Sequence, residues 1–294
     1  MKRVALLGPG TFSEESVQHF LGIGHYEYVN SKFISDVFTN TATGQTEYGV
    51  IPIENTIDGS VALHMDWLVH EVDLPIQAEW VYPVDINLIG YTPHERQDSE
   101  NPYGHIRKVL SHPVALAQCR QFIKGHMPSV EIEQVSTTAE GVRIVQAAKD
   151  PSIAAFGTTN ASKLYDVPVL AALIQDHKDN VTRFLLVGTE KPDLRLSAHM
   201  KTTILVTMPE DYPGGLHQVL SAFAWRRINL SRIESRPTKK KLGNYYFYIE
   251  IEGSLESVLL RSSFEEIEAI GCEVRVLGCY PCYTHADGPI MMEV

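Results

Sequence analysis

The residues of this chain best suited to chemistry lie in a strand predicted over Val181–Val187. This strand carries Thr182 and Arg183 among apolar neighbours. A buried guanidinium is unfavourable without an anionic partner, and its planar set of N–H donors matches a carboxylate. Two interpretations therefore stay open for Arg183: it binds the carboxylate of a ligand, or it forms an internal salt bridge.

A second polar group follows the strand predicted over Tyr48–Ile53. Glu54, Asn55 and Thr56 offer a carboxylate, an amide and a hydroxyl in consecutive positions. Ligands of open α/β sheets bind in the crevice beyond the strand ends, so these side chains are candidates for a binding site. The alternative is a loop that caps the helix predicted over Gly59–Val72.

Hydroxyl groups stand at the starts of three predicted helices. They are Thr11 and Ser13 after Gly8-Pro9-Gly10, Ser111 before His112-Pro113, and Thr137 in a capping box with Glu140. Free N–H groups at a helix start favour small anions, so the first of these loops is a candidate carboxylate site. The alternative is an ordinary strand-to-helix turn. A nucleotide loop is excluded, because neither a G-x-G-x-x-G motif nor a Walker lysine is present.

The composition describes a folded, acidic chain. Its 294 residues are enough for two domains, and 44% of them are hydrophobic. The net charge of −11 argues against nucleic acid or an anionic membrane as a general partner. No apolar run reaches the roughly 18 residues that a membrane span needs. The apolar stretch Val4–Leu7 is too short for an export signal, so we expect a cytoplasmic protein.

The four cysteines are expected to be free thiols in a reducing compartment. Cys279 and Cys282 have the spacing of half a zinc site. No second Cys pair or His pair accompanies them, so the sequence predicts no metal and no cofactor.

The order of predicted elements divides the chain into two domains. Residues 1–190 alternate strands and helices, as in an α/β fold. Residues 191–200 are predicted as a linker, residues 201–282 follow the ferredoxin-like order βαββαβ, and residues 283–294 form a tail. The remaining strands of the first domain are predicted at Val4–Leu7, Ile76–Tyr82, Asp85–Tyr91, Val130–Val135 and Ile153–Phe156. The elements of the second domain are predicted at Thr202–Met208, Pro213–Arg227, Leu230–Ser235, Tyr245–Ile251, Leu255–Ile270 and Val274–Leu277, with a hairpin tip at Lys239–Lys241.

Four of these motifs occur in the order typical of the prephenate dehydratase family, which the chain resembles over nearly its whole length. The motifs are Gly8–Ser13, Glu54–Thr56, Ser111–Pro113 and Thr182–Phe184. Residues 201–282 resemble an ACT domain. The first loop is one residue shorter than expected, and Thr56 replaces a serine but keeps the hydroxyl. Val114 stands where glutamine is common, which makes Gln118 the better amide candidate.

The resemblance implies a bilobal, periplasmic-binding-protein-like α/β body followed by a ferredoxin-like ACT domain. It implies decarboxylative dehydration of prephenate to phenylpyruvate without a metal or cofactor, because the ring itself accepts the electrons. Thr182 is then expected to donate a hydrogen bond to the leaving hydroxyl, while Arg183 grips a carboxylate. The expected catalytic residues are Thr182, Arg183, Glu54 and Asn55, and the expected substrate-binding residues are Thr11, Ser13, Thr56, Ser111, Gln118, Thr137 and Phe184.

The ACT resemblance further implies inhibition by phenylalanine at an interface of a homodimer or homotetramer. Gly214 and Gly215 let the backbone approach a ligand closely, beside free N–H groups that favour its carboxylate. The other expected effector-binding residues are Leu216 and Leu230 for the ring, and Asn229, Glu234 and Ser235 for the ammonium group. The alternative for the two glycines is a flexible turn.

Three other functions stay open. An arogenate dehydratase differs only in an amino group on the substrate, which the sequence does not discriminate. A solute-binding protein shares the two-lobed body, but the missing export signal argues against it. A non-catalytic cytosolic amino-acid sensor would use the ACT domain alone, and Thr182-Arg183 together with Glu54 and Asn55 favours chemistry over that role.

Overall fold

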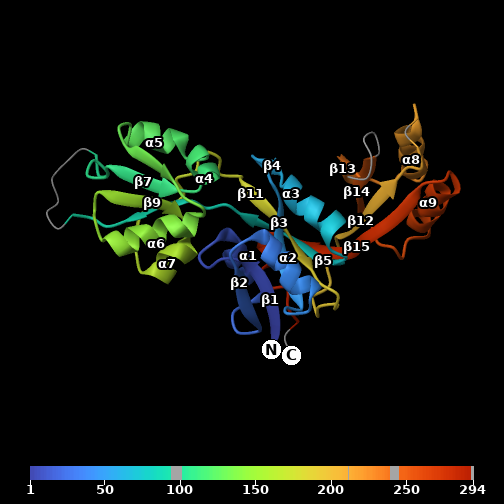
Figure 1. Cartoon of the computed structure of the whole chain (residues 1–294), viewed down its shortest axis with the longest axis horizontal. Helices are drawn as coiled ribbons and strands as arrows, with labels where there is room; N and C mark the ends of the chain where they lie inside the picture. The colour runs from blue at the N-terminus through green and yellow to red at the C-terminus, as the bar shows by residue number, and fades with distance from the viewer. Residues whose placement is uncertain (94–100, 211, 239–244, 293–294) are drawn as a thin grey trace.

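The computed structural model describes residues 1–93, 101–210, 212–238 and 245–292. They form three α/β bodies in a row (Figure 1). Lobe 1 (residues 1–83 and 181–187) lies in the middle, between lobe 2 (residues 84–180) and the C-terminal domain (residues 200–283). The hairpin tip predicted at Lys239–Lys241 falls outside the described residues. None of the described helices is long and apolar enough to cross a membrane.

Lobe 1 is built around one twisted sheet with helices on both faces. Its strands run in the spatial order β5 (Ile76–Pro83), β11 (Val181–Val187), β3 (Tyr48–Asn55), β1 (Lys2–Leu7) and β2 (Tyr26–Ser31), with the short β4 (Gly59–Ser60) beside β3. The helices are α1 (Phe12–Leu21), α2 (Ile34–Ala42), α3 (Ala62–Asp66) and the π-helix η1 (Trp67–Glu71). Helix α1 buries Val17 and Phe20 against one sheet face, and α2 buries Val37 and Phe38 against the other.

Lobe 2 has its own five-stranded sheet. Its strands are ordered β10 (Val169–Ala171), β6 (Asn87–Gly90), β9 (Ile153–Gly157), β7 (Lys108–Ser111) and β8 (Glu131–Gln134), and its helices are α4 (Pro113–Ala117), α5 (Arg120–His126), α6 (Thr138–Ala148) and α7 (Thr159–Tyr165). The chain enters this lobe after β5 and leaves it before β11. The two crossing segments are tied together by the Val84 N–H, which donates to the Asn180 carbonyl at 2.9 Å.

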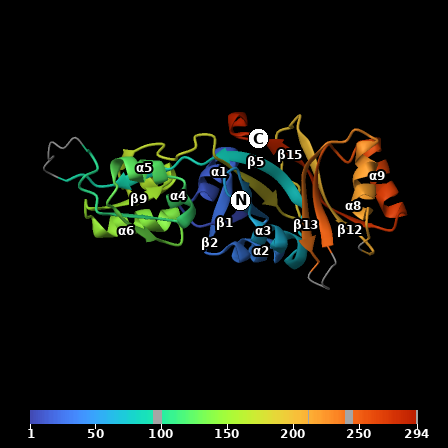
Figure 2. The same cartoon turned by 90° about the horizontal axis from the view of Figure 1, so that it is seen from above.

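The C-terminal domain confirms the predicted βαββαβ order. Its elements are β12 (Met200–Thr207), α8 (Gly215–Ala224), β13 (Leu230–Pro237), β14 (Tyr245–Glu252), α9 (Val258–Ala269) and β15 (Glu273–Tyr283), followed by the 3-10 turn η2 (His285–Asp287). Helices α8 and α9 cover one sheet face through Val219, Phe223 and Phe264. The other face is turned toward lobe 1 (Figure 2).

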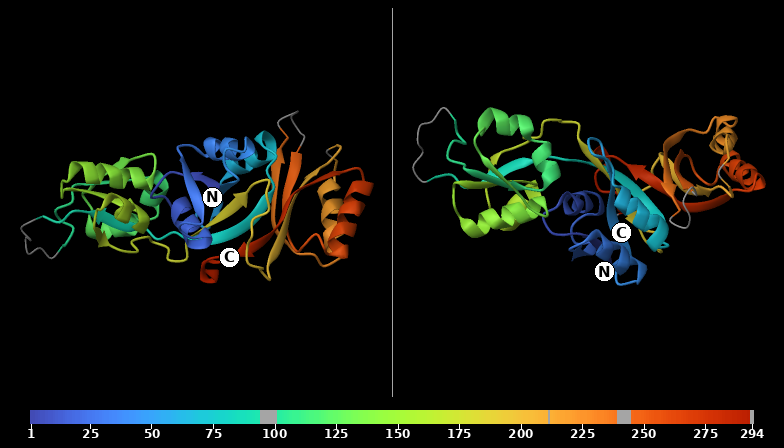
Figure 3. Two further views of the ribbon diagram at one scale, coloured as in Figure 1. Left: turned by 90° about the horizontal axis from the view of Figure 1, so that it is seen from below. Right: turned by 45° about the horizontal axis from the view of Figure 1, so that its top comes forward.

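Strand β15 joins the C-terminal domain to lobe 1 in a single ten-stranded sheet (Figure 3). Its end pairs in parallel with β5, where Cys282 lies opposite Glu79. Gly278 permits this crossing, because a Cβ there would stand 2.5 Å from the Ile76 carbonyl oxygen. Tyr248 and Tyr280 of the C-terminal domain are buried in the same apolar cluster as Ile51 of lobe 1. The two bodies therefore share a core.

Several elements differ from the prediction. The helix predicted over Gly59–Val72 begins only at Ala62, because Gly59 and Ser60 form a hairpin with β3. The last strand continues to Tyr283 instead of ending at Leu277. Residues after 283 pack on lobe 1, where Ile290 is buried and Met291 pairs with Leu194 of the predicted linker.

Candidate active site

The pairing of β3 with β11 contains an irregularity that determines which polar side chains meet. Thr182 lies opposite Asn55 and Arg183 opposite Glu54, but Phe184 lies opposite Pro52. Ile53 is thus an extra residue in β3, a β-bulge. Side chains alternate along a strand, and the extra residue shifts this alternation at its end. Asn55 consequently shares a face with Thr182, while Glu54 shares the opposite face with Arg183.

The Asn55 amide and the Thr182 hydroxyl form a hydrogen-bonded pair at the end of β11 that follows the return of the chain from lobe 2. Asn55 Nδ2 donates to Thr182 Oγ1 at 3.0 Å and to the Val181 carbonyl at 3.2 Å. Asn55 Oδ1 accepts from the N–H groups of Ile57 and Asp58, which locks the orientation of the amide. Since Asn55 donates to Thr182, the hydroxyl proton of Thr182 is left to be donated to a ligand.

Thr56 holds the start of β11 through two hydrogen bonds to the backbone of Val181. Its Oγ1 donates to the Val181 carbonyl at 3.0 Å and accepts from the Val181 N–H at 3.1 Å. A depression of ≈ 290 Å³ opens beside it, lined by Thr56, Ile57 and residues 176–180. This depression lies where the chain returns from lobe 2, immediately before Thr182.

Gln118 of lobe 2 contacts both the loop after β3, at Asp58, and the segment before β11, at Asn180. Its Nε2 donates to Asp58 Oδ2 at 2.8 Å, and its Oε1 accepts from Asn180 Nδ2 at 2.9 Å. Gln118 and Asn180 are buried, so this bridge fixes the distance between the lobes near Thr182. Neither Asp58 nor Asn180 was predicted as a site residue.

The hydroxyls at the helix starts serve mainly as caps. Thr11 Oγ1 accepts from the Glu14 N–H, and Thr137 Oγ1 from the Glu140 N–H at 3.0 Å. Ser13 is buried in the first turn of α1. Ser111 has no exposed surface and donates to the Phe156 carbonyl at 2.7 Å, so a direct substrate contact by this side chain is not supported.

Phe184 also departs from the expected role. It is 1% exposed and packs in the lobe 1 core with Trp80. It follows Thr182 on the same face of β11 but lies one step deeper in the sheet. Phe184 therefore stabilises the strand and offers no surface to a substrate.

The Gly8–Ser13 loop forms a contact between the lobes. Gly10 has a φ of +73°, and a Cβ there would lie 3.2 Å from Ala139 and Ala161 of lobe 2. Its carbonyl accepts from Thr158 Oγ1 at 2.8 Å. The start of α1 thus meets the starts of α6 and α7. Glu15 is enclosed at this contact, and burial raises its pKa above the ordinary 4.5.

Arg183 points away from this site, toward the C-terminal domain. It is 8% exposed, and its guanidinium contacts Glu54 at 3.0 Å, Glu79 at 2.9 Å and Glu250 at 2.5 Å. Burial opposes its charge, but the charges of Glu79 and Glu250 outweigh that effect and raise its pKa. The expected grip on a substrate carboxylate is therefore corrected: the structure supports the internal salt bridge.

The predicted effector residues divide between the two faces of the C-terminal sheet. Leu216 and Leu230 border the core beneath α8 and α9. Glu234 lies on the opposite face, where its carboxylate accepts from Ser60 and Arg232. Glu234 is thus corrected from an ammonium ligand to a partner of lobe 1.

The other four predicted effector residues agree with an effector site on the sheet face that α8 and α9 cover. They are Gly214, Gly215, Asn229 and Ser235. Gly214 has a φ of +92°, and Gly215 begins α8, where a Cβ would lie 2.7 Å from Met208 Sδ. Ser235 pairs with Phe247, which belongs to the helix-side core, and the Asn229 carbonyl accepts from the Glu252 N–H at 3.1 Å.

Two glutamates that were not predicted as site residues also lie inside apolar strands, as Arg183 does. Glu79 lies within Ile76–Pro83 and Glu250 within Tyr245–Glu252, and both are almost completely buried. The same cost of burial that marked Arg183 applies to them. Among the described residues, no group of three or more His, Cys, Asp or Glu side chains could hold a metal ion.

Comparison with known proteins agrees with this arrangement. The family model for prephenate dehydratase matches residues 4–192, and the model for the ACT domain matches residues 202–268. A prephenate dehydratase of Bacillus subtilis is 36% identical over 288 residues, which covers 96% of this chain and 99% of that protein. One from Methanocaldococcus jannaschii is 38% identical over 281 residues, covering 94% of this chain and 97% of the relative.

Solved structures include a prephenate dehydratase from Arthrobacter aurescens in complex with L-Phe. It superposes with a TM-score of 0.83 at 30% identity and covers 95% of this chain and 90% of its own. The chain belongs to the prephenate dehydratase family and carries a C-terminal ACT domain.

Proposed function

We propose that this chain converts prephenate to phenylpyruvate in phenylalanine biosynthesis. The observation that carries the proposal, beside family membership, is the 3.0 Å hydrogen bond from Asn55 Nδ2 to Thr182 Oγ1. It orients a hydroxyl donor at the strand end that faces lobe 2. The relatives named prephenate dehydratase match this chain over nearly its full length.

The reaction needs little covalent assistance from the protein. The bond between the ring carbon and the carboxylate breaks, and its electron pair enters the ring. The opposite carbon–oxygen bond then breaks, so that CO₂ and the hydroxyl leave and an aromatic ring forms. Thr182 stabilises the departing oxygen as a hydrogen-bond donor, because a threonine hydroxyl is too weak an acid to supply a free proton at neutral pH. The proton that completes the leaving water comes from solvent.

Substrate carboxylates would be held between the lobes. Arg183 is occupied by protein carboxylates, so we assign this role to N–H groups at the starts of α1 and α6, beside Thr11 and Thr137. These helix starts lie close together, as the contact of Gly10 with Ala139 shows. The first N–H groups of a helix lack intrahelical partners and carry partial positive charge. Thr56 and Gln118 would contribute beside the segments that connect the lobes, where Thr56 contacts Val181 and Gln118 contacts Asp58 and Asn180.

Phenylalanine is the proposed effector. A relative of 30% identity is described in complex with L-Phe, and the ACT domain of this chain retains Gly214 and Gly215 at the start of α8. We propose that L-Phe binds on the helix side of this domain, with its carboxylate at the α8 start and its ring near Leu216 and Leu230. Strand β13 lies at the edge of the ten-stranded sheet, which allows a second copy to complete the site in a homodimer or homotetramer.

The test is the formation of phenylpyruvate from prephenate by the purified protein, with arogenate supplied in a parallel reaction. The proposal expects phenylpyruvate from prephenate and a marked decrease in rate when L-Phe is added. If the protein converts arogenate but not prephenate, it is an arogenate dehydratase. If it converts neither compound, the dehydratase function is contradicted.

A further inference from the structure

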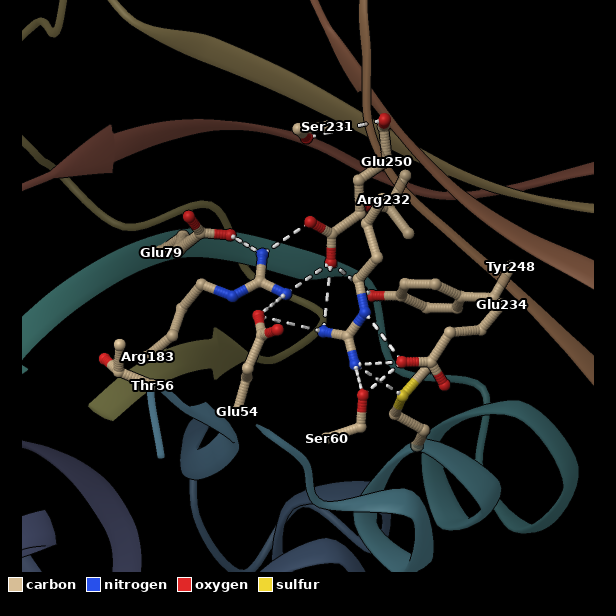
Figure 4. A network of polar contacts seen from close by, with 12 residues as sticks. Glu54, Thr56, Ser60, Glu79, Arg183, Ser231, Arg232, Glu234, Tyr248 and Glu250 are labelled. Carbon is tan, nitrogen blue, oxygen red and sulfur yellow. Dashed lines mark hydrogen bonds and ion pairs between the residues drawn. The ribbon is translucent and has the colours of Figure 1, made fainter. Parts of the chain in front are cut away.

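A largely buried charge cluster lies between lobe 1 and the C-terminal domain (Figure 4). We call it the Arg183 cluster. Lobe 1 contributes Glu54, Glu79 and Arg183, and the C-terminal domain contributes Lys201, Arg232, Glu234 and Glu250. The cluster thus combines three cations and four anions, and every one of these residues has a partner across the domain boundary or beside it.

One carboxylate oxygen is shared by both domains. Glu54 Oε2 lies 3.0 Å from Arg183 Nη2 of lobe 1 and 3.4 Å from Arg232 Nη1 of the C-terminal domain. Glu250 completes the connection, because its two oxygens lie 2.5 Å from Arg183 Nη1 and 3.7 Å from Arg232 Nη1. Arg232 lies in β13 and Glu250 lies in β14. A displacement of either strand would therefore alter the contacts of both Glu54 and Arg183.

Burial makes these contacts energetically consequential. Glu79 and Glu250 are 2% and 1% exposed. Burial opposes the charge of Glu250, but its hydrogen bond to Arg183 and the surrounding cations outweigh this and hold its pKa below the ordinary value. Removing one partner from a buried ion pair leaves the other uncompensated, which is far less favourable than the intact pair. A shift of the domain boundary that separates these partners is therefore energetically unfavourable.

The cluster is one residue away from the proposed reactive groups on both strands. Arg183 follows Thr182 in β11, and Glu54 precedes Asn55 in β3, and the two pairs lie opposite each other. The bulge at Ile53 turns Glu54 toward the cluster and Asn55 toward Thr182. Any movement of the Glu54–Arg183 pair is transmitted through a single peptide unit on each strand to the Asn55–Thr182 hydrogen bond.

We propose that Glu54 and Arg183 are positioning residues through which Arg232 and Glu250 of the C-terminal domain set the geometry of Asn55 and Thr182. The expected effect on kcat rests on the proposed function, whereas the expected effect on the geometry of Asn55 and Thr182 does not. A shift of the C-terminal domain that withdraws Arg232 and Glu250 disorders the hydrogen bond that orients Thr182. The cluster is thus the physical connection by which an effector bound to the ACT domain changes turnover.

The experiment compares Glu54→Gln, Arg232→Lys and the double variant. Glutamine keeps the shape of the half-exposed Glu54 side chain, and lysine keeps the charge of Arg232 but cannot contact Glu54, Glu234 and Glu250 together. Each single variant should lower kcat about tenfold with KM within about twofold, since the groups that bind the substrate carboxylates are untouched. The double variant should be no slower than about the worse single variant, because both changes break one connection. Inhibition by L-Phe should weaken in all three.

Asp66→Asn is the matched control, because it weakens the Arg236–Asp66 pair (2.7 Å) at the same domain boundary, outside the cluster. Its kcat should stay within about twofold of the parent. Full kcat in Glu54→Gln and Arg232→Lys, or multiplicative losses in the double variant, would overturn the proposal.

A second readout does not depend on turnover. The N–H of Thr56 donates to the Val181 carbonyl, and the N–H of Val181 donates to Thr56 Oγ1. Amide hydrogen exchange at these two positions should become about tenfold faster in Arg232→Lys and unchanged in Asp66→Asn. Unchanged exchange in Arg232→Lys would refute the coupling even if the protein turned over no prephenate, whereas faster exchange without turnover would refute only the proposed function.

Discussion

The Asn55 side-chain amide donates to the Thr182 hydroxyl at 3.0 Å across the end of the β3–β11 pairing. The contact exists because Ile53 is an extra residue in β3, which moves Asn55 to the face of Thr182. The amide is held by two N–H groups of its own loop. A hydroxyl that receives a hydrogen bond from a fixed donor keeps its own proton for another acceptor, and Thr182 is therefore able to donate to a ligand.

Asn55→Asp tests the direction of this hydrogen bond. The carboxylate retains the shape and the two accepted N–H bonds, but it cannot donate to Thr182 and accepts the hydroxyl proton instead. We expect kcat to fall about 10²-fold at neutral pH, with partial recovery in acid as the carboxyl group gains a proton. A variant whose steady-state kcat matches the parent across the pH range would show that the amide donor is dispensable.

Glu250→Gln tests the electrostatic role of the Arg183 cluster in stability. The pKa of Glu250 is held below the ordinary 4.5, so its contribution to stability is present above about pH 4.5 and is lost as pH falls through the folded-state pKa. The parent should therefore exceed Glu250→Gln in free energy of unfolding at about pH 7, and the difference should shrink below about pH 4. Urea unfolding across this range is the measurement, with Glu252→Gln as the control at an exposed position of the same strand. A difference that grows in acid would contradict the assignment.

Glu15→Gln is expected to have the opposite pH dependence. Burial raises the pKa of Glu15, so the stability linked to its protonated form is present below about pH 4.5 and is lost as pH rises through the raised value. Glutamine keeps the acceptor for the Asn160 N–H, which now lies 2.6 Å from Glu15 Oε1. The variant should have a higher Tm than the parent at about pH 8 and a similar Tm at about pH 4. A lower Tm at about pH 8 would show that the charge of Glu15 stabilises the contact between the lobes.

Gly215→Val tests the effector site. The new side chain would collide with Met208, whose Sδ lies 2.7 Å from the position of a Cβ. Either the Met208 side chain or the turn before α8 must then move, and the L-Phe concentration for half-inhibition should rise about tenfold, within the range typical of coupling between sites. Uninhibited kcat should change by less than about twofold. Gly125→Ala in lobe 2, where a Cβ meets nothing within 4 Å, serves as the control. Unaltered inhibition in Gly215→Val would place the effector elsewhere.

The sequence predicted the elements that have strong local signals. The strand at Val181–Val187 has the predicted bounds, because a run of β-branched and aromatic residues has few alternatives. The βαββαβ order was likewise readable from strand and helix patterns. The extension of β15 to Tyr283 was not, because it depends on pairing with β5, about two hundred residues away in the chain.

The site was harder to predict than the fold for the same reason. Arg183 was recognised as a buried charge, but its partners Glu79 and Glu250 lie 104 and 67 residues away, and no local pattern connects them. The bulge at Ile53 has no signature in Ile51–Asn55, although it decides that Asn55, and not Glu54, meets Thr182. The sequence therefore identified the polar residues but not the faces on which they lie.

The most direct test of the account is the rate of the chemical step in Thr182→Val and Thr182→Ser, measured in single turnovers with enzyme in excess of prephenate. Valine nearly reproduces the shape of threonine but lacks the donor, whereas serine retains it. We expect phenylpyruvate formation to slow about 10²–10³-fold in Thr182→Val and less than about tenfold in Thr182→Ser. A valine variant within about threefold of the parent would contradict the assignment of Thr182 as the donor to the leaving hydroxyl.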